Sequence, residues 1–524
     1  MADPVDAAGR EGGVLAGDAG HSRARRLLGG WSANLLQLTL GITQQLALVP
    51  VFLHFGSRDL LAAWLALYAA GNLALVADVG LQARAINRFL AFKSCVDGEG
   101  RMAHFFAHMQ RLYLGLTGLL IALVIAGCAF RSPAHALGYQ EMDDFSIAFV
   151  IMTAGMLSVL PSNLVSALYR AHGLYARAVW IQCAAMLASQ LAQLVAIVAT
   201  ARLIPIVIAF LAPQVIAATW LVMIDAPRLF PLLSRVRTRA RPSWRWIAGQ
   251  FRRAFPFGVA GGTDVALQNL PVLLVSAIVA DRVAVAQWGL TRVVAGLVRA
   301  LCVQTTLPLA AELGYDRAIG ARQALRRLYA RGSVLVTLLA SVVVSALLAF
   351  WKDFFALWTH GTIPYDPPLT LTLLIGAQLA APSFLALGFT YYSDRGELLA
   401  RTKGLQFVAF VALAPVLTAR LGPLGTALAL VATDLLVQFG LLTVIVMWQT
   451  LVRPARHLMF LAALMLVVTA FGTWLGEAIL SALPGTGFAR FVAACTLWAF
   501  TIGLLATPLV SRRFRERLAD MIPG

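Results

Sequence analysis

Residues 58–64 read RDLLAAW, and residues 282–288 read RVAVAQW directly after Asp281. Both stretches open an apolar run with an arginine that neighbours an aspartate, and both place a tryptophan six positions after the arginine. The two tryptophans, Trp64 and Trp288, are 224 positions apart. This shared phrase predicts that the chain consists of two related halves.

Matching residues on either side of the phrase extend the repeat. A Gln-Gln or Gln-Asn pair begins 20 positions before each tryptophan, and a glycine followed by an arginine recurs downstream at offsets of 223 and 224. The matched residues are Gln44 with Gln268, Gly173 with Gly396, and Arg177 with Arg401. Two related halves in a membrane protein are typical of transporters, whose lobes rock about a shared central site.

The composition predicts an all-α polytopic membrane protein. The chain is 60% apolar and only 13% charged, and its mean hydropathy is +0.79. Apolar runs of about 20 residues recur along it, and each is long enough to cross about 30 Å of hydrocarbon. We predict about fourteen transmembrane helices. The first covers residues 31–53, and the eleventh covers only residues 404–417 around Pro415.

The basic residues predict the orientation. Of the 42 lysines and arginines, 33 fall in segments on the same side as the N-terminus, seven in the opposite loops and two within a span. The segment before the eleventh span adds Arg395, Arg401 and Lys403 to the larger group. By the positive-inside rule, both termini are expected in the cytoplasm. The net charge of +18 then reflects topology, and no nucleic-acid partner is expected because no soluble domain remains to bind one.

The spans predict two pseudo-symmetric six-helix lobes followed by two C-terminal helices. The expected segments are a cytoplasmic tail at 1–26, a first lobe at 27–224, a basic linker at 225–256, a second lobe at 257–448, the extra helices at 449–510 and a basic cytoplasmic tail at 511–524. Within the linker, Trp244, Ile247 and Phe251 share one helical face, opposite several arginines. This pattern favours an amphipathic helix at the inner membrane surface, with a plain basic loop as the alternative.

Several motifs carry a family resemblance. Trp64, the run Asp78-Val79-Gly80-Leu81, and then Arg84 and Arg88 resemble the second-helix pattern of the Wzx-type polysaccharide flippases. Gly396, Arg401 and the run RLGPLGTALA at 420–429 are similar to the connection between the eleventh and twelfth helices of that family. The family belongs to the multidrug/oligosaccharidyl-lipid/polysaccharide exporter superfamily, with the multidrug (MATE) exporters and the lipid II flippases. The resemblance covers roughly residues 25–450.

The resemblance implies a flippase that moves a polyprenyl-diphosphate-linked oligosaccharide across the bacterial inner membrane by alternating access, for surface polysaccharide biosynthesis. A cation-coupled multidrug exporter is the alternative, and a membrane glycan polymerase is a third. Recruitment of a polysaccharide polymerase or another assembly partner is one role open to the two extra helices. The chain carries no ATP-binding motif and no catalytic constellation, so we expect neither an enzyme nor a cofactor.

Two arginines within the eighth span are candidates for substrate binding. Arg292 and Arg299 are seven positions apart and share one helical face. A guanidinium fork suits a diphosphate or an acidic sugar. The alternatives are a salt bridge to Asp264 on the neighbouring span, and a side chain of Arg299 that reaches the inner membrane surface.

A second pair of arginines lies at the predicted cytoplasmic end of the second span. Arg84 and Arg88 are one turn apart and could receive the lipid headgroup. Ordinary positive-inside anchoring explains them as well. Asp78, shortly before them, is interpreted as a structural residue: an ion-pair partner that holds Arg84 in place, or a charge at a helix end.

Two carboxylates inside spans, Asp264 and Asp434, are candidates for coupling transport to a proton or Na⁺ gradient. Pairing with an arginine is the alternative for each. Gly258 and Gly262, before Asp264, permit close helix approach. Pro271, after it, suggests a bent gating helix.

The remaining site candidates are amides that would hydrogen-bond to sugar hydroxyls, namely Gln44 and Gln268, with interhelical hydrogen bonds as the alternative. No structural disulfide or metal site is expected, because the five cysteines are scattered and form no CxxC pair. They are Cys95, Cys128, Cys183, Cys302 and Cys495.

Overall fold

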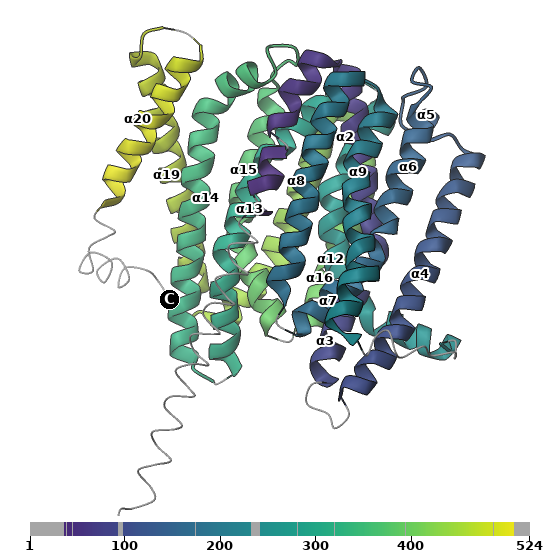
Figure 1. Ribbon diagram of the computed structural model, residues 1–524. Coiled ribbons are helices and arrows are strands. Elements are labelled where there is room, and N and C mark those ends of the chain that lie inside the picture. Colours follow the sequence, from purple (N-terminus) through teal and green to yellow (C-terminus); the bar gives the residue numbers. More distant parts are fainter. Residues whose placement is uncertain are drawn as a thin grey trace, which may run out of the picture. The chain divides into compact units, whose positions relative to one another are not determined.

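The computed structural model (Figure 1) confirms the all-helical membrane architecture. The structure describes residues 36–37, 39–44, 46–92, 98–172, 174–231, 242–279, 281–318, 320–393, 395–485 and 487–507. Within these ranges, 13 helices are long and apolar enough to cross a membrane, and a shorter apolar helix covers Thr39–Phe55. Together they correspond one to one with the fourteen predicted spans. The predicted tails at 1–26 and 511–524 lie outside the described residues.

The helices follow one another along the chain with short connections. In order they are α2 (Arg58–Ala74), η1 (Leu75–Asp78), α3 (Leu81–Phe92), α4 (Gly98–Phe130), α5 (Pro133–Ala136), α6 (Phe145–Ser158), α7 (Leu160–Ala171), α8 (Tyr175–Thr200), α9 (Leu203–Trp220), η2 (Leu221–Asp225), α10 (Ala226–Leu229), α12 (Trp244–Val279), α13 (Arg282–Ala318), α14 (Arg322–Trp358), α15 (Pro367–Tyr392), α16 (Gly396–Leu421), α17 (Pro423–Thr433), η3 (Asp434–Thr443), α18 (Val444–Thr450), α19 (Pro454–Ala482) and α20 (Phe488–Ala506).

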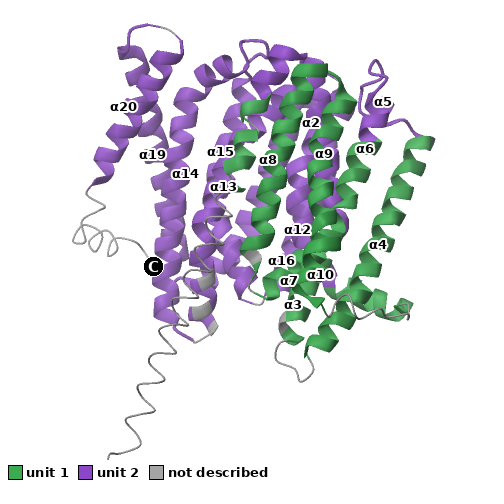
Figure 2. Cartoon of the chain, viewed as in Figure 1, with its two compact units in different colours: residues 1–48, 81–129, 150–253 green, residues 49–80, 130–149, 254–524 purple. Residues whose placement is uncertain are grey.

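The chain divides into two compact units (Figure 2). Unit 1 comprises Met1–Leu48, Leu81–Ala129 and Val150–Arg253, and unit 2 comprises Val49–Gly80, Phe130–Phe149 and Ala254–Gly524. Two segments of the predicted first lobe, 49–80 and 130–149, therefore cluster with the predicted second lobe. The two-lobe boundary itself stays a prediction.

The eleventh span is longer than the sequence suggested. We predicted residues 404–417, but α16 runs over 26 residues and is long and apolar enough to cross a membrane. The prediction stopped short because Arg401 and Lys403 were interpreted as residues of a cytoplasmic loop. Lys403 is buried among the helices, so its side chain is not the solvated loop residue that the sequence suggested.

The second span breaks at the Asp78-Val79-Gly80-Leu81 motif. Helix η1 ends at Asp78, Val79 and Gly80 take positive φ values of 46° and 76°, and α3 begins at Leu81. A β-branched residue with positive φ is strained. The glycine is required twice, because a Cβ at Gly80 would also lie 2.6 Å from the carbonyl oxygen of Ala254 on α12.

Helix α12 supplies the other side of this close crossing. A Cβ on Gly258 would lie 2.5 Å from the carbonyl carbon of Val79, and one on Gly262 would lie 2.9 Å from a methyl group of Val76. The structure thus confirms that these glycines permit close approach. Helix α12 runs unbroken from Trp244 to Val279, through Pro256 and Pro271. The amphipathic segment 242–255 is therefore helical rather than a loop, and from Trp244 it forms the first turns of α12. Its location at the inner membrane surface stays a prediction.

Each half of the chain ends in a span that contains a π-helical segment. Helix η2 lies in the sixth span and η3 in the twelfth. Segments of π-helix are rare and occur frequently at functional sites. Each contains an acidic residue that is buried, Asp225 at the end of η2 and Asp434 at the start of η3.

Polar contacts fix α19 against α14 and α15 within unit 2. The Ser333 hydroxyl lies 2.7 Å from Nε2 of His457, and the Gln378 amide donates to the Thr469 hydroxyl at 2.6 Å. Further along, Thr473 donates to the carbonyl oxygen of Ser345 at 3.4 Å. The first extra helix is therefore joined to α14 and α15 along much of its length.

Candidate functional site

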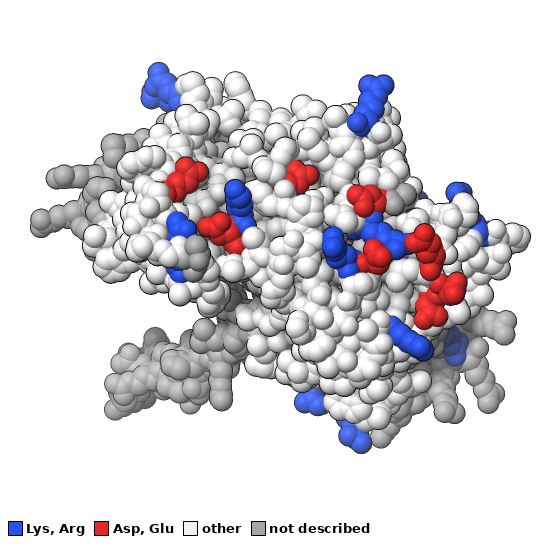
Figure 3. All heavy atoms as spheres, turned by 90° about the horizontal axis from the view of Figure 1, so that it is seen from above, with Lys and Arg blue, Asp and Glu red and all other residues white. Residues whose placement is uncertain are grey.

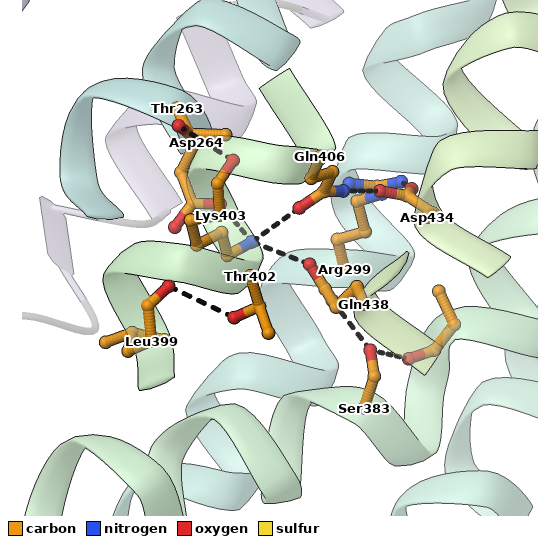
Figure 4. A network of polar contacts seen from close by, with 11 residues as sticks. Thr263, Asp264, Arg299, Ser383, Leu399, Thr402, Lys403, Gln406, Asp434 and Gln438 are labelled. Carbon is orange, nitrogen blue, oxygen red and sulfur yellow. Dashed lines mark hydrogen bonds and ion pairs between the residues drawn. The ribbon is translucent and has the colours of Figure 1, made fainter. Parts of the chain in front are cut away.

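Polar side chains from five membrane-spanning segments of unit 2 meet in one network (Figure 4). Two of its residues are cationic, two are anionic, and the others are amides or hydroxyls that connect them. They are Asp264 on α12, Arg299 on α13, Ser383 on α15, Lys403 and Gln406 on α16, and Asp434 and Gln438 on η3. The four formal charges balance.

The first ion pair joins α12 to α16. The Lys403 ammonium lies 2.7 Å from Oδ1 of Asp264. It also donates to the amide oxygens of Gln438 at 2.6 Å and Gln406 at 3.2 Å. Its side chain is 3% exposed, whereas that of Asp264 is 47% exposed. All three ammonium protons are therefore matched with oxygen acceptors, as a buried ammonium requires.

The second ion pair joins α13 to η3. Arg299 pairs with Asp434, whose side chain is 1% exposed. Gln406 donates its amide to the other carboxylate oxygen of Asp434 at 2.6 Å, and so connects the two ion pairs. This contact differs from both structural alternatives considered for Arg299, which were a salt bridge to Asp264 and a side chain that reaches the inner membrane surface. Pairing of Asp434 with an arginine, the alternative to ion coupling, is observed.

Local geometry explains why these residues meet. Lys403 and Gln406 are three apart and share one face of α16, as residues i and i+3 do in an α-helix. Asp434 and Gln438 both lie in η3. The amide of Gln438 donates to the Ser383 hydroxyl at 2.6 Å, which holds its oxygen toward Lys403.

The unequal exposure of the first ion pair leads to a prediction. Asp264→Asn leaves a buried ammonium without its counter-charge, and we expect a cost of about 3 kcal/mol. Lys403→Met leaves a half-exposed carboxylate that water can solvate, and removes a donor from the amide oxygens of Gln406 and Gln438, so we expect a smaller cost of about 1–2 kcal/mol. Thermal unfolding of the purified variants measures the difference. Equal costs, or a larger cost for Lys403→Met, would contradict this account.

Arg292 differs from its neighbour Arg299. It is partly buried on α13, and its Nη1 atom is fully enclosed without a hydrogen-bond partner among the described residues. Helix α13 packs against α2 and α15 within unit 2. A buried donor without an acceptor costs about 1–3 kcal/mol, and more when it is charged. Arg292 thus gives a membrane-spanning helix a buried guanidinium nitrogen without an acceptor among the described residues.

The predicted entry arginines gather with a third basic residue in unit 1. Nε of Arg84 donates weakly to Oε1 of Gln250 at 3.4 Å, and the exposed Arg88 lies over the ring of Phe92 at 4.6 Å. Burial, together with the positive charges of Arg253 and Arg88, lowers the pKa of the Arg84 guanidinium. Mutual repulsion of this kind is expected where cations converge.

The remaining predicted residues are divided between the two units. Gln44 is buried in unit 1, whereas Gln268 is exposed on α12 in unit 2. Asp78 lies at the end of η1, in unit 2. Their proposed roles stay predictions.

Sequence reasoning missed a second charged cluster, in unit 1. Arg177 makes two hydrogen bonds to Asp225, at 2.6 and 3.0 Å, and the Tyr169 hydroxyl donates to the same carboxylate at 2.6 Å. The counterpart of Arg177 in the repeat, Arg401, instead pairs with the exposed Glu397 on its own helix. The signal available in the sequence was Asp225, because a carboxylate at the end of an apolar span needs a cationic or hydrogen-bonding partner.

The two stretches of the repeat meet in unit 2. Arg282 lies 2.8 Å from Asp59 and 2.7 Å from Glu141. Figure 3 views the molecule from the end that carries α5, and there acidic side chains lie beside basic ones. The repeated arginine-aspartate phrase therefore supplies an ion pair between α2 and α13.

Comparisons with known proteins identify the fold. No protein-family model matches the chain, and a search of curated proteins gave no match. Among solved structures, the lipid II flippase MurJ in an inward closed conformation superposes with a TM-score of 0.66 at 10% identity, covering 92% of this chain and 99% of its own. An inward-facing multidrug resistance MATE transporter gives 0.58 at 14% identity, covering 82% and 98%, and an outward-facing one gives 0.51 at 15%, covering 84% and 95%. The chain thus has the fold of these membrane transporters.

Proposed function

We propose that the chain is a flippase that moves a polyprenyl-diphosphate-linked oligosaccharide across a bacterial inner membrane by alternating access. The observation that carries this proposal is Arg292. Its unsatisfied guanidinium nitrogen lies inside a membrane-spanning helix of a transporter fold. A diphosphate oxygen would complete its hydrogen bonding and neutralise its charge.

The cluster around Arg84 supports the same substrate chemistry. Burial lowers the pKa of Arg84, and the positive charges of Arg253 and Arg88 lower it further. An anion bound among the three guanidinium groups would offset the contribution of these two charges. A lipid headgroup that carries a diphosphate is such an anion. These arginines belong to unit 1 and Arg292 to unit 2, so each unit carries its own basic group for the headgroup.

The fold comparison favours a lipid-linked substrate over a drug. The lipid II flippase aligns with 92% of the chain, whereas the two MATE transporters align with 82% and 84%. The difference is about the length of α19 and α20 together. A site built on arginines also repels the cationic compounds that a multidrug exporter would have to bind.

Ion coupling through Asp264 or Asp434 would have to disturb an ion pair. Each carboxylate already has a cationic partner, Lys403 and Arg299 respectively. We propose that anion binding at α13 competes with Asp434 for Arg299, and that Gln406 passes this change to Lys403. Coupling to a proton gradient would then act on the same network.

Deletion of the gene in its own host tests the proposal. We expect a lipid-linked oligosaccharide to accumulate, as measured by mass spectrometry, while the surface polysaccharide disappears. The mass of the accumulated lipid would name the glycan. Unchanged glycolipids and an unchanged surface coat would refute the flippase, and drug-export assays would then test the alternative.

The entry cluster gives a separate prediction. We expect the double variant Arg84→Ala/Arg88→Ala to lower flipping about tenfold, because two contacts to the headgroup are lost that solvent screens and that each contribute up to about 1 kcal/mol. Arg101→Ala is a matched control, since Arg101 is an exposed arginine on α4 in the same unit. The measurement is surface polymer at matched protein levels. An equal loss of surface polymer in Arg101→Ala would show that the effect comes from the lower positive charge of unit 1 and not from contacts of Arg84 and Arg88.

A further inference from the structure

The ammonium of Lys403 occupies a cage of side-chain oxygens. Three segments contribute to it: α12 through Asp264, α16 through Gln406, and η3 through Gln438. The oxygens lie 2.7, 3.2 and 2.6 Å from Nζ, and Figure 4 shows them converging on it. The side chain that carries the nitrogen is 3% exposed.

The chemistry of the cage is that of a site for a hard cation. One carboxylate and two amide carbonyls form an all-oxygen set, which hard metal cations prefer over nitrogen or sulfur ligands. The single carboxylate balances one positive charge. The set therefore suits a monovalent cation, and the chain fills it with a cation of its own.

Several contacts keep the oxygens in place independently of the ammonium. The amide of Gln438 is fixed by Ser383, and that of Gln406 by Asp434. The Thr263 hydroxyl donates to the backbone carbonyl of Lys403 at 3.3 Å, which joins α12 to α16 beside the cage. Loss of the lysine side chain would therefore leave the three acceptors facing one another.

We infer that Lys403 is a tethered cation that occupies a sodium-type site between α12, α16 and η3 and excludes free Na⁺ from it. Desolvation of each buried ion costs several kcal/mol, so a second cation beside the ammonium is strongly disfavoured. The protein then needs no Na⁺ at this place. Removal of the ammonium converts the cage into a site that binds Na⁺. The inference concerns ion binding and does not depend on which substrate is moved.

Thermal unfolding of the purified full-length protein tests the inference. The wild type, Lys403→Ser and Lys403→Asn are heated in equimolar sodium chloride or choline chloride. We expect no sodium-dependent change for the wild type, and a saturable rise of about 2–4 °C in the Tm of both variants. The asparagine variant would also offer an additional carbonyl oxygen while retaining a polar side chain. The double variant Lys403→Ser/Asp264→Asn lacks the cage carboxylate and should lose the response.

Each other outcome overturns the inference. If sodium stabilises the wild type and still stabilises Asp264→Asn, the ion binds elsewhere. If sodium stabilises the wild type but not Asp264→Asn, the ammonium does not exclude Na⁺ from the cage. Well-folded variants without a sodium response would show that the oxygens form no cation site. Aggregation of both variants in sodium buffer would show that Na⁺ cannot replace the ammonium.

Discussion

Arg292→Ala is expected to stop display of the surface polysaccharide and to cause its lipid-linked precursor to accumulate. The variant removes the guanidinium whose buried nitrogen has no partner among the described residues. A charge-assisted hydrogen bond contributes about 1.5–3 kcal/mol, so flipping should fall about 10- to 100-fold. Complementation of a deletion strain, with mass spectrometry of the glycolipid pool, measures the effect.

Two companion variants make this result specific. Arg292→Lys keeps the charge but loses the bidentate fork, so we expect partial activity. Arg420→Ala removes an exposed arginine at the end of α16 and should behave as wild type. Stability should change little or rise in Arg292→Ala, because an unsatisfied buried donor disappears. Normal polysaccharide display by this variant at wild-type levels would remove Arg292 from the mechanism.

Gly258→Val is expected to prevent accumulation of folded protein. A Cβ at this position meets the backbone of Val79, which is itself held in a strained conformation. Neither backbone can retreat as a flexible side chain would, so we expect a cost of about 3 kcal/mol or more. Gel filtration of a fluorescent fusion, followed by thermal unfolding, measures it.

Gly261 provides the matched control for this steric prediction. It lies one turn further along α12, where a Cβ meets nothing within 4 Å. Gly261→Val therefore makes the same chemical change at a nearby position of the same helix, and should leave the gel-filtration profile unchanged. If both variants behave alike, the close crossing of α12 with the second span does not limit stability.

The fourteen spans could be predicted because length and apolarity suffice to define a membrane helix. The same criterion did not show that Lys403 is buried among other helices. A lysine near the end of an apolar run indicates a loop unless its partners are known, and those partners lie 139 and 35 positions away on other helices. Pairings of that kind depend on tertiary contacts, which a single sequence does not record.

The candidate site was predicted in part. Spacing alone showed that Arg292 and Arg299 share a face. It could not show that, among the residues that the structure describes, Arg299 pairs with an aspartate and Arg292 with no carboxylate. The repeat was visible in the sequence, yet its arginine-aspartate phrase gave no sign that Arg282 would pair with Asp59 from the other copy. Gly258 and Gly262 did indicate close contact, because glycines in a membrane span permit close helix approach.

The polar contacts of α19 have a mechanical consequence. Apolar helix surfaces slide past one another with small changes in energy, but hydrogen bonds at His457, Thr469 and Thr473 fix the axial position of α19 at several heights. The first and last of these lie about 24 Å apart along the helix, at 1.5 Å per residue. A shift of α19 by one turn would break them all. During a transport cycle α14 and α19 would therefore move together as a rigid body. A label on α19 would then report the motion of α14.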